Sequence, residues 1–494
     1  MTRPNLLFVY TDQQRADSLA AYGNDLIQMP NLNRLAEESV VFEKAYVTEP
    51  VCQPSRAALL TGLYPHAAAG LTGDLDNRLQ SLKSCLPELV EHGEYVCGHH
   101  GKWHLGDDVF AQHGFDDWIS TEDHEHRPFY SEGRDSFQPS TYHQFLLDHG
   151  FEPDDESPDG FRAFTHRFHA NLPEEYSQPA FLARHASQFI RDHKAHPFIL
   201  YVSIFEPHQP YCGPRDDQYD PAQVPLPANF AAVPTEDQPL KIRALYHLYE
   251  EQGFVVPLKT ELDWRQLTAK YWGNCSLVDT HVGTILDTLE ECGVSDNTIV
   301  VFTSDHGEMM GSHRLRGKGC MYEEAVCVPL LIRLPGQRKC QRVEGPVSQV
   351  DLMPTLLDLM DQPIPGHLQG TSLRPLFQQG GSSASKRDVF VEWQGPLGVS
   401  SFPEAMRGVA SEADLKESSE DSVRTIVTPD GWKFNCSQLG EHELYNLEED
   451  PGETRNLVRD PQYSSLLRDL TSRLRRWQGE TGDTVDLSSA NELF

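Results

Sequence analysis

Residues 6–13 read Leu6-Leu7-Phe8-Val9-Tyr10-Thr11-Asp12-Gln13, a short apolar run that ends in a carboxylate and an amide. Two later runs have the same design: residues 198–205 lead into His208, and residues 299–302 lead into Asp305 and His306. Runs this short, rich in β-branched and aromatic residues, are typical of buried parallel strands. Ligands of open α/β sheets bind at the carboxyl ends of the strands. Because all three runs end in polar side chains, we expect these ends to form a single site.

Helical patterns alternate with the apolar runs, at residues 179–193 and 271–291. This alternation predicts an α/β fold with a large, mostly parallel sheet sandwiched by helices. We expect residues 1–377 to form this larger domain. Two stretches within it, residues 121–175 and 211–263, show little periodicity and are rich in Pro and aromatic residues. Long irregular stretches in compact proteins are usually lids or binding loops.

The C-terminal part of the chain has a different pattern. Residues 378–385 are rich in Gln, Gly and Ser, which is typical of a linker. Beyond them, residues 388–393 and 424–427 resemble strands, and residues 463–478 have the pattern of a helix. The sequence therefore predicts a smaller α+β domain over residues 386–494. The chain has no internal repeat.

Acidic residues dominate the charge balance. The 494 residues include 41 Lys and Arg against 74 Asp and Glu, a formal net charge of −33. This excess argues against nucleic acid or an anionic membrane as a partner and favours high solubility. If the substrate is an anion, long-range attraction will not deliver it, so the site needs its own local positive charge.

The ten cysteines are scattered without close pairing, which does not resemble a disulfide framework. The N-terminal residues carry no apolar signal region, and no later stretch approaches the length of a membrane span. We therefore expect a cytoplasmic protein with reduced thiols. The sequence predicts no oligomeric state.

One motif carries most of the chemical information. Pro54 lies just inside an Ala- and Leu-rich stretch, as at the start of a helix, so Cys52 should lie at the helix N-terminus. Exposed amides and the helix dipole favour an anion there, and Arg56, one turn on, can hold it. The alternatives are a buried structural Cys or an unmodified thiol nucleophile. The motif reads Cys52-Gln53-Pro54-Ser55-Arg56-Ala57-Ala58-Leu59-Leu60-Thr61-Gly62.

Four residues at the ends of two predicted strands form a candidate metal set: Asp12, Gln13, Asp305 and His306. They offer mainly hard oxygen ligands, which prefer Ca²⁺, Mg²⁺ or Mn²⁺ over softer ions. Calcium is the favoured ion. The alternative for His306 is a structural histidine beside the ligands.

The Cys-x-Pro-Ser-Arg motif with its Leu-Thr-Gly ending resembles the signature of type I sulfatases, members of the alkaline phosphatase superfamily in which the Cys is converted to formylglycine. The stretch Gly101-Lys102-Trp103-His104-Leu105-Gly106 resembles a second sulfatase motif. The likeness extends over most of the chain, from residue 5 to residue 336 and again near residues 443–451. It implies an alkaline-phosphatase-like α/β domain with a smaller C-terminal domain.

The resemblance also implies a mechanism. Formylglycine at Cys52 would be hydrated, would ligate the metal with the four strand-end residues, and would attack the sulfur of a sulfate ester. Arg56, Lys102 and Lys318 would neutralise the sulfuryl oxygens. His208 would protonate the leaving alcohol and His104 would deprotonate the second hydroxyl, or the two histidines would exchange these roles. His99 and His100 suggest zinc, but no paired cysteines accompany them at ligand spacing.

The implied partners are a small anionic substrate, a sulfated carbohydrate or an aryl sulfate, and, transiently, a formylglycine-generating enzyme. Many sulfatases carry Asp-Asp and Asp-Asn where this chain has Asp12-Gln13 and Asp305-His306. These variants resemble those of phosphonate monoester hydrolases, so a phosphonate monoester or phosphodiester hydrolase is the alternative. A third hypothesis, a catalytically silent binding protein for sulfated glycans, would require loss of Cys52 or Arg56, and both are present.

Overall fold

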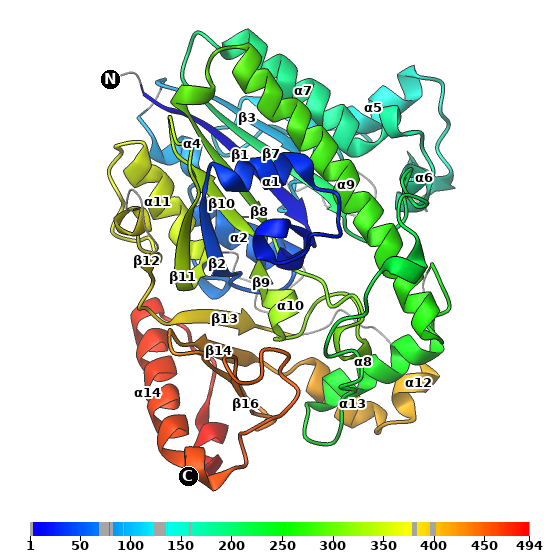
Figure 1. Ribbon diagram of the computed structural model, residues 1–494, viewed down its shortest axis with the longest axis vertical. Coiled ribbons are helices and arrows are strands. Elements are labelled where there is room, and N and C mark those ends of the chain that lie inside the picture. The colour runs from blue at the N-terminus through cyan, green and yellow to red at the C-terminus, as the bar shows by residue number, and fades with distance from the viewer. Residues whose placement is uncertain are drawn as a thin grey trace.

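The computed structural model describes residues 3–68, 79, 83–91, 93–122, 135, 137–157, 160–253, 255–377, 383–395 and 402–493. In this part of the chain, ten strands form one sheet in the order β12-β11-β2-β10-β8-β1-β7-β3-β4, with β9 paired to β2 (Figure 1). The strands are β1 (Asn5–Asp12), β2 (Val40–Tyr46), β3 (Val96–Gly101), β4 (Asp117–Ser120), β7 (Phe198–Pro207), β8 (Thr298–Ser304), β9 (Cys327–Val328), β10 (Leu330–Arg333), β11 (Gln341–Ser348) and β12 (Ser383–Ala384).

Most neighbours in this sheet are parallel. Strand β1 pairs in parallel with β7 and β8, and β3 pairs in parallel with β7 and β4. The exceptions are β10, which is antiparallel to β2 and β8, and the short β9. The three predicted apolar runs are β1, β7 and β8, side by side at the centre. The α/β fold class that the sequence predicts is confirmed.

Helices cover both faces of the sheet, as the alternation along β1 requires. Leu7 and Val9 belong to a core cluster that includes side chains of α1, α7 and α9, whereas Leu6 and Phe8 pack in a second cluster with α2 and α11. The helices of this part are α1 (Pro30–Glu37), α2 (Cys52–Thr61), α3 (Pro65–Ala68), α4 (Leu86–Leu89), α5 (Thr141–Asp148), α6 (His166–Ala170), α7 (Gln178–His193), α8 (Leu240–Glu251), α9 (Glu261–Glu291), α10 (Glu323–Val326) and α11 (Leu352–Leu359).

Helix α9 begins ten residues before the predicted start at residue 271. Thr260 and Asp263 form a capping box there, and Trp264 and Leu267 extend the buried stripe. The stretches predicted as irregular also contain regular structure, namely α5, α6, α8 and the hairpin of β5 (Asp155–Glu156) and β6 (Arg162–Ala163). Residues 123–134, 136, 158–159 and 254 of these stretches lie outside the described residues.

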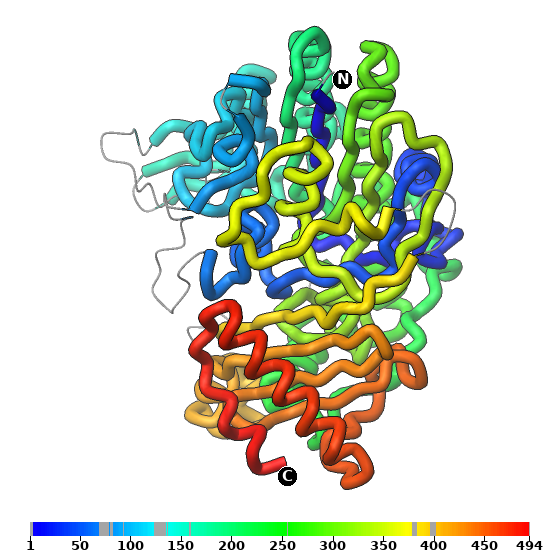
Figure 2. Tube along the Cα trace, turned by 90° about the vertical axis from the view of Figure 1, so that its left-hand side faces the viewer, coloured from blue at the N-terminus to red at the C-terminus, as the bar shows by residue number. Residues whose placement is uncertain are grey.

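The C-terminal part contains a separate antiparallel sheet in the order β13-β14-β15-β16. Helix α14 (Ser464–Thr481) packs on it through Leu467, Leu470 and Leu474, against Phe434 of β15. The remaining elements are β13 (Val389–Trp393), β14 (Val423–Val427), β15 (Trp432–Ser437), β16 (Glu443–Asn446), α12 (Glu404–Arg407) and α13 (Glu412–Ser419). Figure 2 shows this sheet stacked below the larger one, with the two chain ends at opposite ends of the molecule.

One sequence expectation changes here. Of the predicted linker, Ser383 and Ala384 form β12 and pair with β11, because the chain runs along the edge of the large sheet at that point. Residues 378–382 lie outside the described residues. The division into domains over residues 1–377 and 386–494 stays a prediction. All ten cysteines are free, as expected. Among the described residues, the structure contains no helix with the length and apolar character needed to cross a bilayer.

Candidate active site

The site lies where the central strands end. Asp12 is the last residue of β1, Asp305 directly follows β8, His208 follows β7 and Lys102 follows β3. These four strands are adjacent and parallel, so their carboxyl ends meet at one edge of the sheet. The structure thus brings the predicted strand-end residues together.

Cys52 is the first residue of helix α2 and is 4% exposed. The helix ends at Gly62, whose positive φ of 68° closes the last turn. The Cys52 Sγ lies 3.2 Å from His306 Nε2, 3.6 Å from Asp12 Oδ1 and 2.7 Å from Lys318 Nζ. The helix therefore delivers its N-terminal side chain into the cluster of strand-end residues, as the position of Pro54 predicts.

Four side chains form a compact set that could hold a metal ion. The ligand atoms of Asp12, Cys52, Asp305 and His306 all lie within 4.8 Å of one another. His306 Nδ1 lies 2.9 Å from the Gly307 carbonyl, which can only accept, so Nδ1 is the donor of this hydrogen bond and Nε2 is the ring atom that faces the cluster. Two carboxylates and an imidazole nitrogen are a donor set that fits a divalent cation. The Cys52 sulfur is the fourth possible ligand atom of this set.

Gln13 completes the set in a strained backbone conformation, with φ of 70°. Its amide N–H donates to Asp305 Oδ1 at 3.1 Å, and its side-chain Nε2 donates to the Tyr211 hydroxyl at 2.7 Å and to Glu308. Its Oε1 is buried and has no hydrogen-bond partner among the described residues. An orphaned buried carbonyl oxygen on a residue whose backbone contacts Asp305 is an atom that a bound cation would satisfy.

Arg56 is fully buried and braces the carboxylates. Its Nε donates to Asp305 Oδ2 at 2.8 Å and its Nη2 to Asp12 Oδ2 at 3.1 Å, while Nη1 donates to Ser203 Oγ at 2.8 Å. These contacts occupy most of the guanidinium donors. The structure therefore places Arg56 behind the metal set, whereas its predicted contact with the substrate stays a prediction.

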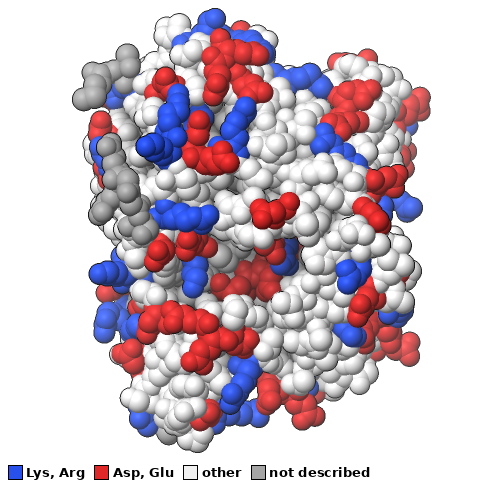
Figure 3. Space-filling model, in the orientation of Figure 1, with Lys and Arg blue, Asp and Glu red and all other residues white. Residues whose placement is uncertain are grey.

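The two lysines have freer positions. Lys102 Nζ is 2.9 Å from Asp12 Oδ2 and 3.5 Å from Glu122, and it lies over the ring of Phe205. Lys318 Nζ reaches Cys52 from a loop before α10, and its side chain is 21% exposed. Figure 3 shows acidic and basic side chains intermingled on the face drawn, with carboxylates in the hollow at its centre. With a net charge of −33 on the whole chain, a substrate anion would depend on local cations such as Lys102 and Lys318.

The charges of the cluster shift one another's protonation. Burial alone would raise the pKa of Asp12, but the charges of Lys102, Lys318 and Arg56 hold it well below its usual value. Burial and Lys318 hold the pKa of His208 well below its usual value, so its imidazole is neutral near pH 7. Its Nδ1 lies 2.9 Å from the Gln209 carbonyl, and its Nε2 lies 4.0 Å from Asp12 Oδ1.

His104 lies two residues after Lys102 with a positive φ of 63°, and its predicted proton-transfer role stays a prediction. The zinc interpretation of His99 and His100 finds no support: His99 stacks on Trp118, whereas His100 pairs with Asp117 at 2.7 Å. Sequence reasoning missed four residues that contact the cluster, Ser203, Glu122, Tyr211 and Glu308. Only Glu308, an acid two positions after His306, gave a signal that could have found it.

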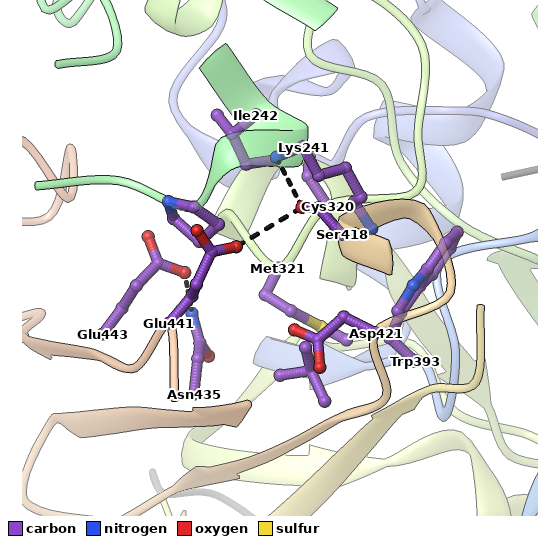
Figure 4. A pocket seen from close by; sticks show the side chains of 12 residues that line it. Lys241, Ile242, Cys320, Met321, Trp393, Ser418, Asp421, Asn435, Glu441 and Glu443 are labelled. Carbon is purple, nitrogen blue, oxygen red and sulfur yellow. Dashed lines mark hydrogen bonds between the residues drawn. The ribbon is translucent and has the colours of Figure 1, made fainter. Parts of the chain in front are cut away.

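A second pocket lies apart from this cluster, between α8 and the C-terminal sheet (Figure 4). Lys241 Nζ lies 3.5 Å above the ring of Trp393, and burial lowers the pKa of this lysine to about 8. Cys320 and Met321, which line the pocket, follow Lys318 in the same loop. The pocket thus joins the C-terminal part to the segment that carries Lys318.

Glu49, three residues before Cys52, gives a stability prediction. Burial and the neighbouring Glu392 raise its pKa to about 8 from an ordinary value near 4.5. The folded protein then keeps a proton that the unfolded chain has lost, so this residue's contribution to stability falls as the pH rises from about 4.5 to 8. We expect Glu49→Gln to remove that loss and to stabilise the fold by about 2 kcal/mol at pH 8.5.

Urea unfolding of both proteins at pH 5 and pH 8.5 measures this difference. The gain should be small at pH 5, where Glu49 is protonated in the folded state and partly so in the unfolded chain. An equal gain at both pH values would contradict the assignment of the proton to Glu49.

Comparisons with known proteins agree with this geometry. Residues 4–362 match the family model described as Sulfatase, and residues 311–480 match that of N-sulphoglucosamine sulphohydrolase, C-terminal. The chain belongs to the sulfatase family. As a member it is an enzyme with an alkaline-phosphatase-like fold and a smaller C-terminal antiparallel sheet.

Two curated relatives cover nearly the whole chain. The multifunctional alkaline phosphatase superfamily protein PehA of Trinickia caryophylli is 27% identical over 97% of this chain and 96% of its own. The N-acetylglucosamine-6-O-sulfatase of Bacteroides thetaiotaomicron is also 27% identical, over 100% of this chain and 89% of its own. Among solved structures, the phosphonate monoester hydrolase SpPMH of Silicibacter pomeroyi has the same fold, with a TM-score of 0.77, 24% identity and coverage of 97% and 96%.

Proposed function

We propose that this enzyme hydrolyses sulfate monoesters with an oxidised Cys52 as nucleophile and one divalent cation, favoured to be Ca²⁺. The observation that carries the proposal is the position of Cys52, at the N-terminus of α2 and inside the set of Asp12, Asp305 and His306. A thiol is a poor ligand for the hard cation that these carboxylates prefer, whereas an oxygen at residue 52 would suit it. The sulfated amino sugar in the name of one relative makes a sulfated carbohydrate the first substrate class to test.

Asp12, Asp305, His306, the Oε1 of Gln13 and the modified residue 52 would hold the cation. A cation bound there supplies Lewis acidity, which favours an oxygen nucleophile and stabilises negative charge. Formylglycine supplies that oxygen as its hydrate and would be made from Cys52 by a formylglycine-generating enzyme. Cytoplasmic residence stays a prediction.

The other residues would bind charge and move protons. Lys102 and Lys318 would lie against the sulfuryl oxygens, because their ammonium groups reach Asp12 and Cys52 at the centre of the cluster. Arg56 would keep the carboxylates of Asp12 and Asp305 in place. His208 and His104 would serve the leaving alcohol and the second hydroxyl, in either order.

A phosphonate monoester or phosphodiester hydrolase is the second candidate. Two observations favour it: Gln13 and His306 stand where many sulfatases have Asp and Asn, and phosphonate monoester hydrolase is the name of a neighbour with the same fold. Both candidates use the same nucleophile and cation, so only the reacting group of the substrate separates them.

The experiment is a substrate panel run on protein of known formylglycine content. It compares kcat/KM for 4-nitrophenyl sulfate, 4-nitrophenyl phenylphosphonate, a phosphodiester and glucosamine 6-sulfate. We expect one of the sulfate esters to exceed every phosphorus substrate by at least about tenfold, a difference of roughly 1.4 kcal/mol in transition-state binding. If kcat/KM for the phosphonate or the phosphodiester exceeds that for both sulfate esters, the second candidate replaces the proposal.

A further inference from the structure

Glu308 is a fully buried carboxylate that contacts both Gln13 of the candidate metal set and the loop that carries Lys318. It follows Asp305, His306 and Gly307 and is 0% exposed. Each of its oxygens accepts two hydrogen bonds, from distant residues at Oε2 and from the following loop at Oε1. Oε2 accepts from the Tyr211 hydroxyl at 2.5 Å and from Gln13 Nε2, and Oε1 accepts from the Met310 amide at 3.0 Å and from the Gly317 amide at 2.5 Å.

The hydrogen bonds to Glu308 Oε2 fix the orientation of the Gln13 side-chain amide. Four donors are directed at Glu308, two at each oxygen, so both oxygens act as hydrogen-bond acceptors. The Tyr211 hydroxyl donates its single proton to Glu308, and its oxygen accepts from Gln13 Nε2 at 2.7 Å. Tyr211 and Glu308 therefore both accept hydrogen bonds from the NH₂ group of Gln13. Oε1, the atom able to ligate a cation, must occupy the other end.

Gln13 needs such a partner because its amide could otherwise rotate by half a turn at little cost. The rotated amide would present NH₂ to the metal set, and this group would repel a cation. Its backbone is already fixed, since its N–H donates to Asp305 at 3.1 Å and its carbonyl accepts from Tyr271 at 2.8 Å. The remaining freedom is the side-chain orientation, which Glu308 and Tyr211 remove.

The hydrogen bonds to Glu308 Oε1 hold the loop that carries Lys318. The Gly317 amide that donates to Glu308 belongs to the residue immediately before Lys318, whose Nζ lies 2.7 Å from Cys52 Sγ. Gly317 has φ of 76°, and the Gly319 amide donates to the Pro50 carbonyl at 3.1 Å. Lys318 is thus anchored on both sides, by Glu308 before it and by the strand-to-helix segment of Cys52 after it.

We propose that Glu308 is a positioning residue that presents Gln13 Oε1 to a divalent cation and holds Lys318 against residue 52. The inference rests on the proposed function, since it takes the cation site as given. In this proposal one carboxylate links a metal ligand, Gln13, to the loop that carries Lys318. These two residues are far apart in the sequence. The effect of Glu308 on catalysis would pass entirely through Gln13 and Lys318.

The proposal has two arms, which separate substitutions test. The metal arm is the orientation of Gln13 towards the cation, and the loop arm is the support of the loop that carries Lys318. In Glu308→Gln the new amide can keep its oxygen on the Met310 and Gly317 amides, but its NH₂ then faces the NH₂ of Gln13. We expect Ca²⁺ to bind the demetallated variant at least about tenfold more weakly than the wild type in isothermal titration calorimetry. The paired exchange Gln13→Glu with Glu308→Gln restores a donor facing an acceptor, and should recover most of that affinity.

Glu49→Gln is the matched control, because it also removes a buried acid near Cys52 but lies against Gln394 and Glu392. It should bind Ca²⁺ as the wild type does. For the loop, Glu308→Ala should speed amide hydrogen exchange in residues 309–322, whereas Glu308→Gln should leave it close to the wild-type rate.

Wild-type Ca²⁺ affinity in Glu308→Gln, or a paired exchange that binds no better than Glu308→Gln alone, would overturn the metal arm. Unchanged exchange in Glu308→Ala would overturn the loop arm. If Glu308→Gln does not fold, the paired exchange alone decides the metal arm. Asp12→Asn distinguishes a failure of the proposed function: undiminished Ca²⁺ binding in that variant would show that the cation site itself is wrong.

Discussion

Replacement of Cys52 by Ala should leave a folded protein with turnover reduced on the order of 10³-fold or more. The side chain lies at the centre of the cluster, 2.7 Å from Lys318 Nζ and 3.2 Å from His306 Nε2, and the proposed nucleophile is made from it. Its volume is small and the helix begins at this residue, so little core packing is lost. The measurement is kcat on the best sulfate ester of the panel, together with the melting temperature.

Cys340 supplies the control, because it is exposed and far along the chain from the cluster. Cys340→Ala should keep full activity. If Cys52→Ala retained more than a tenth of the wild-type kcat, the nucleophile would have to be another group.

Asp12→Asn should be nearly as damaging. Asp12 is fully buried, approaches Cys52 and His306 with Oδ1, and receives Arg56 and Lys102 at Oδ2. The amide keeps the shape but removes a charge, so a divalent cation loses one of its two carboxylates and the cationic pair loses a partner. We expect loss of measurable Ca²⁺ binding and a fall in kcat of at least about 10²-fold.

The stability of this variant also carries information. Asp12→Asn leaves Arg56 with Asp305 and Lys102 with Glu122, and we expect the loss of this shared buried carboxylate to destabilise the metal-free protein by about 3 kcal/mol. Asp17→Asn, which changes an exposed acid that forms an ion pair with Arg15 at 2.6 Å, is the control and should change neither property. Retention of full activity in metal-stripped Asp12→Asn protein would refute the metal assignment.

Much of this site could be predicted from the sequence because it depends on local rules. Each apolar run ended in a polar residue, and parallel strands bring such ends together. Pro54 and the Ala-rich stretch fixed the helix start, so Cys52 was expected at its N-terminus and is found there. These patterns depend only on neighbouring residues and on the geometry of α/β sheets.

The errors have equally physical causes. Helix α8 was not predicted from the sequence. This helix packs against α12 and α13, and such tertiary contacts stabilise it more than its hydrophobic periodicity indicates. The substrate contact of Arg56 stays a prediction, but its hydrogen bonds to Asp12, Asp305 and Ser203 were not foreseen, because sequence spacing does not record how donors are shared. The bond between Gln13 and Glu308 joins residues 295 positions apart, a pairing that only the folded chain reveals.

The proposal that residue 52 must be oxidised can be tested without any substitution. Preparations made with different amounts of a formylglycine-generating enzyme are divided, and peptide mass mapping gives the fraction of residue 52 present as formylglycine in each. We expect kcat per mole of protein towards the sulfate ester to rise linearly with that fraction and to pass through zero at zero conversion. A preparation in which residue 52 is entirely a thiol but turnover is undiminished would contradict the account.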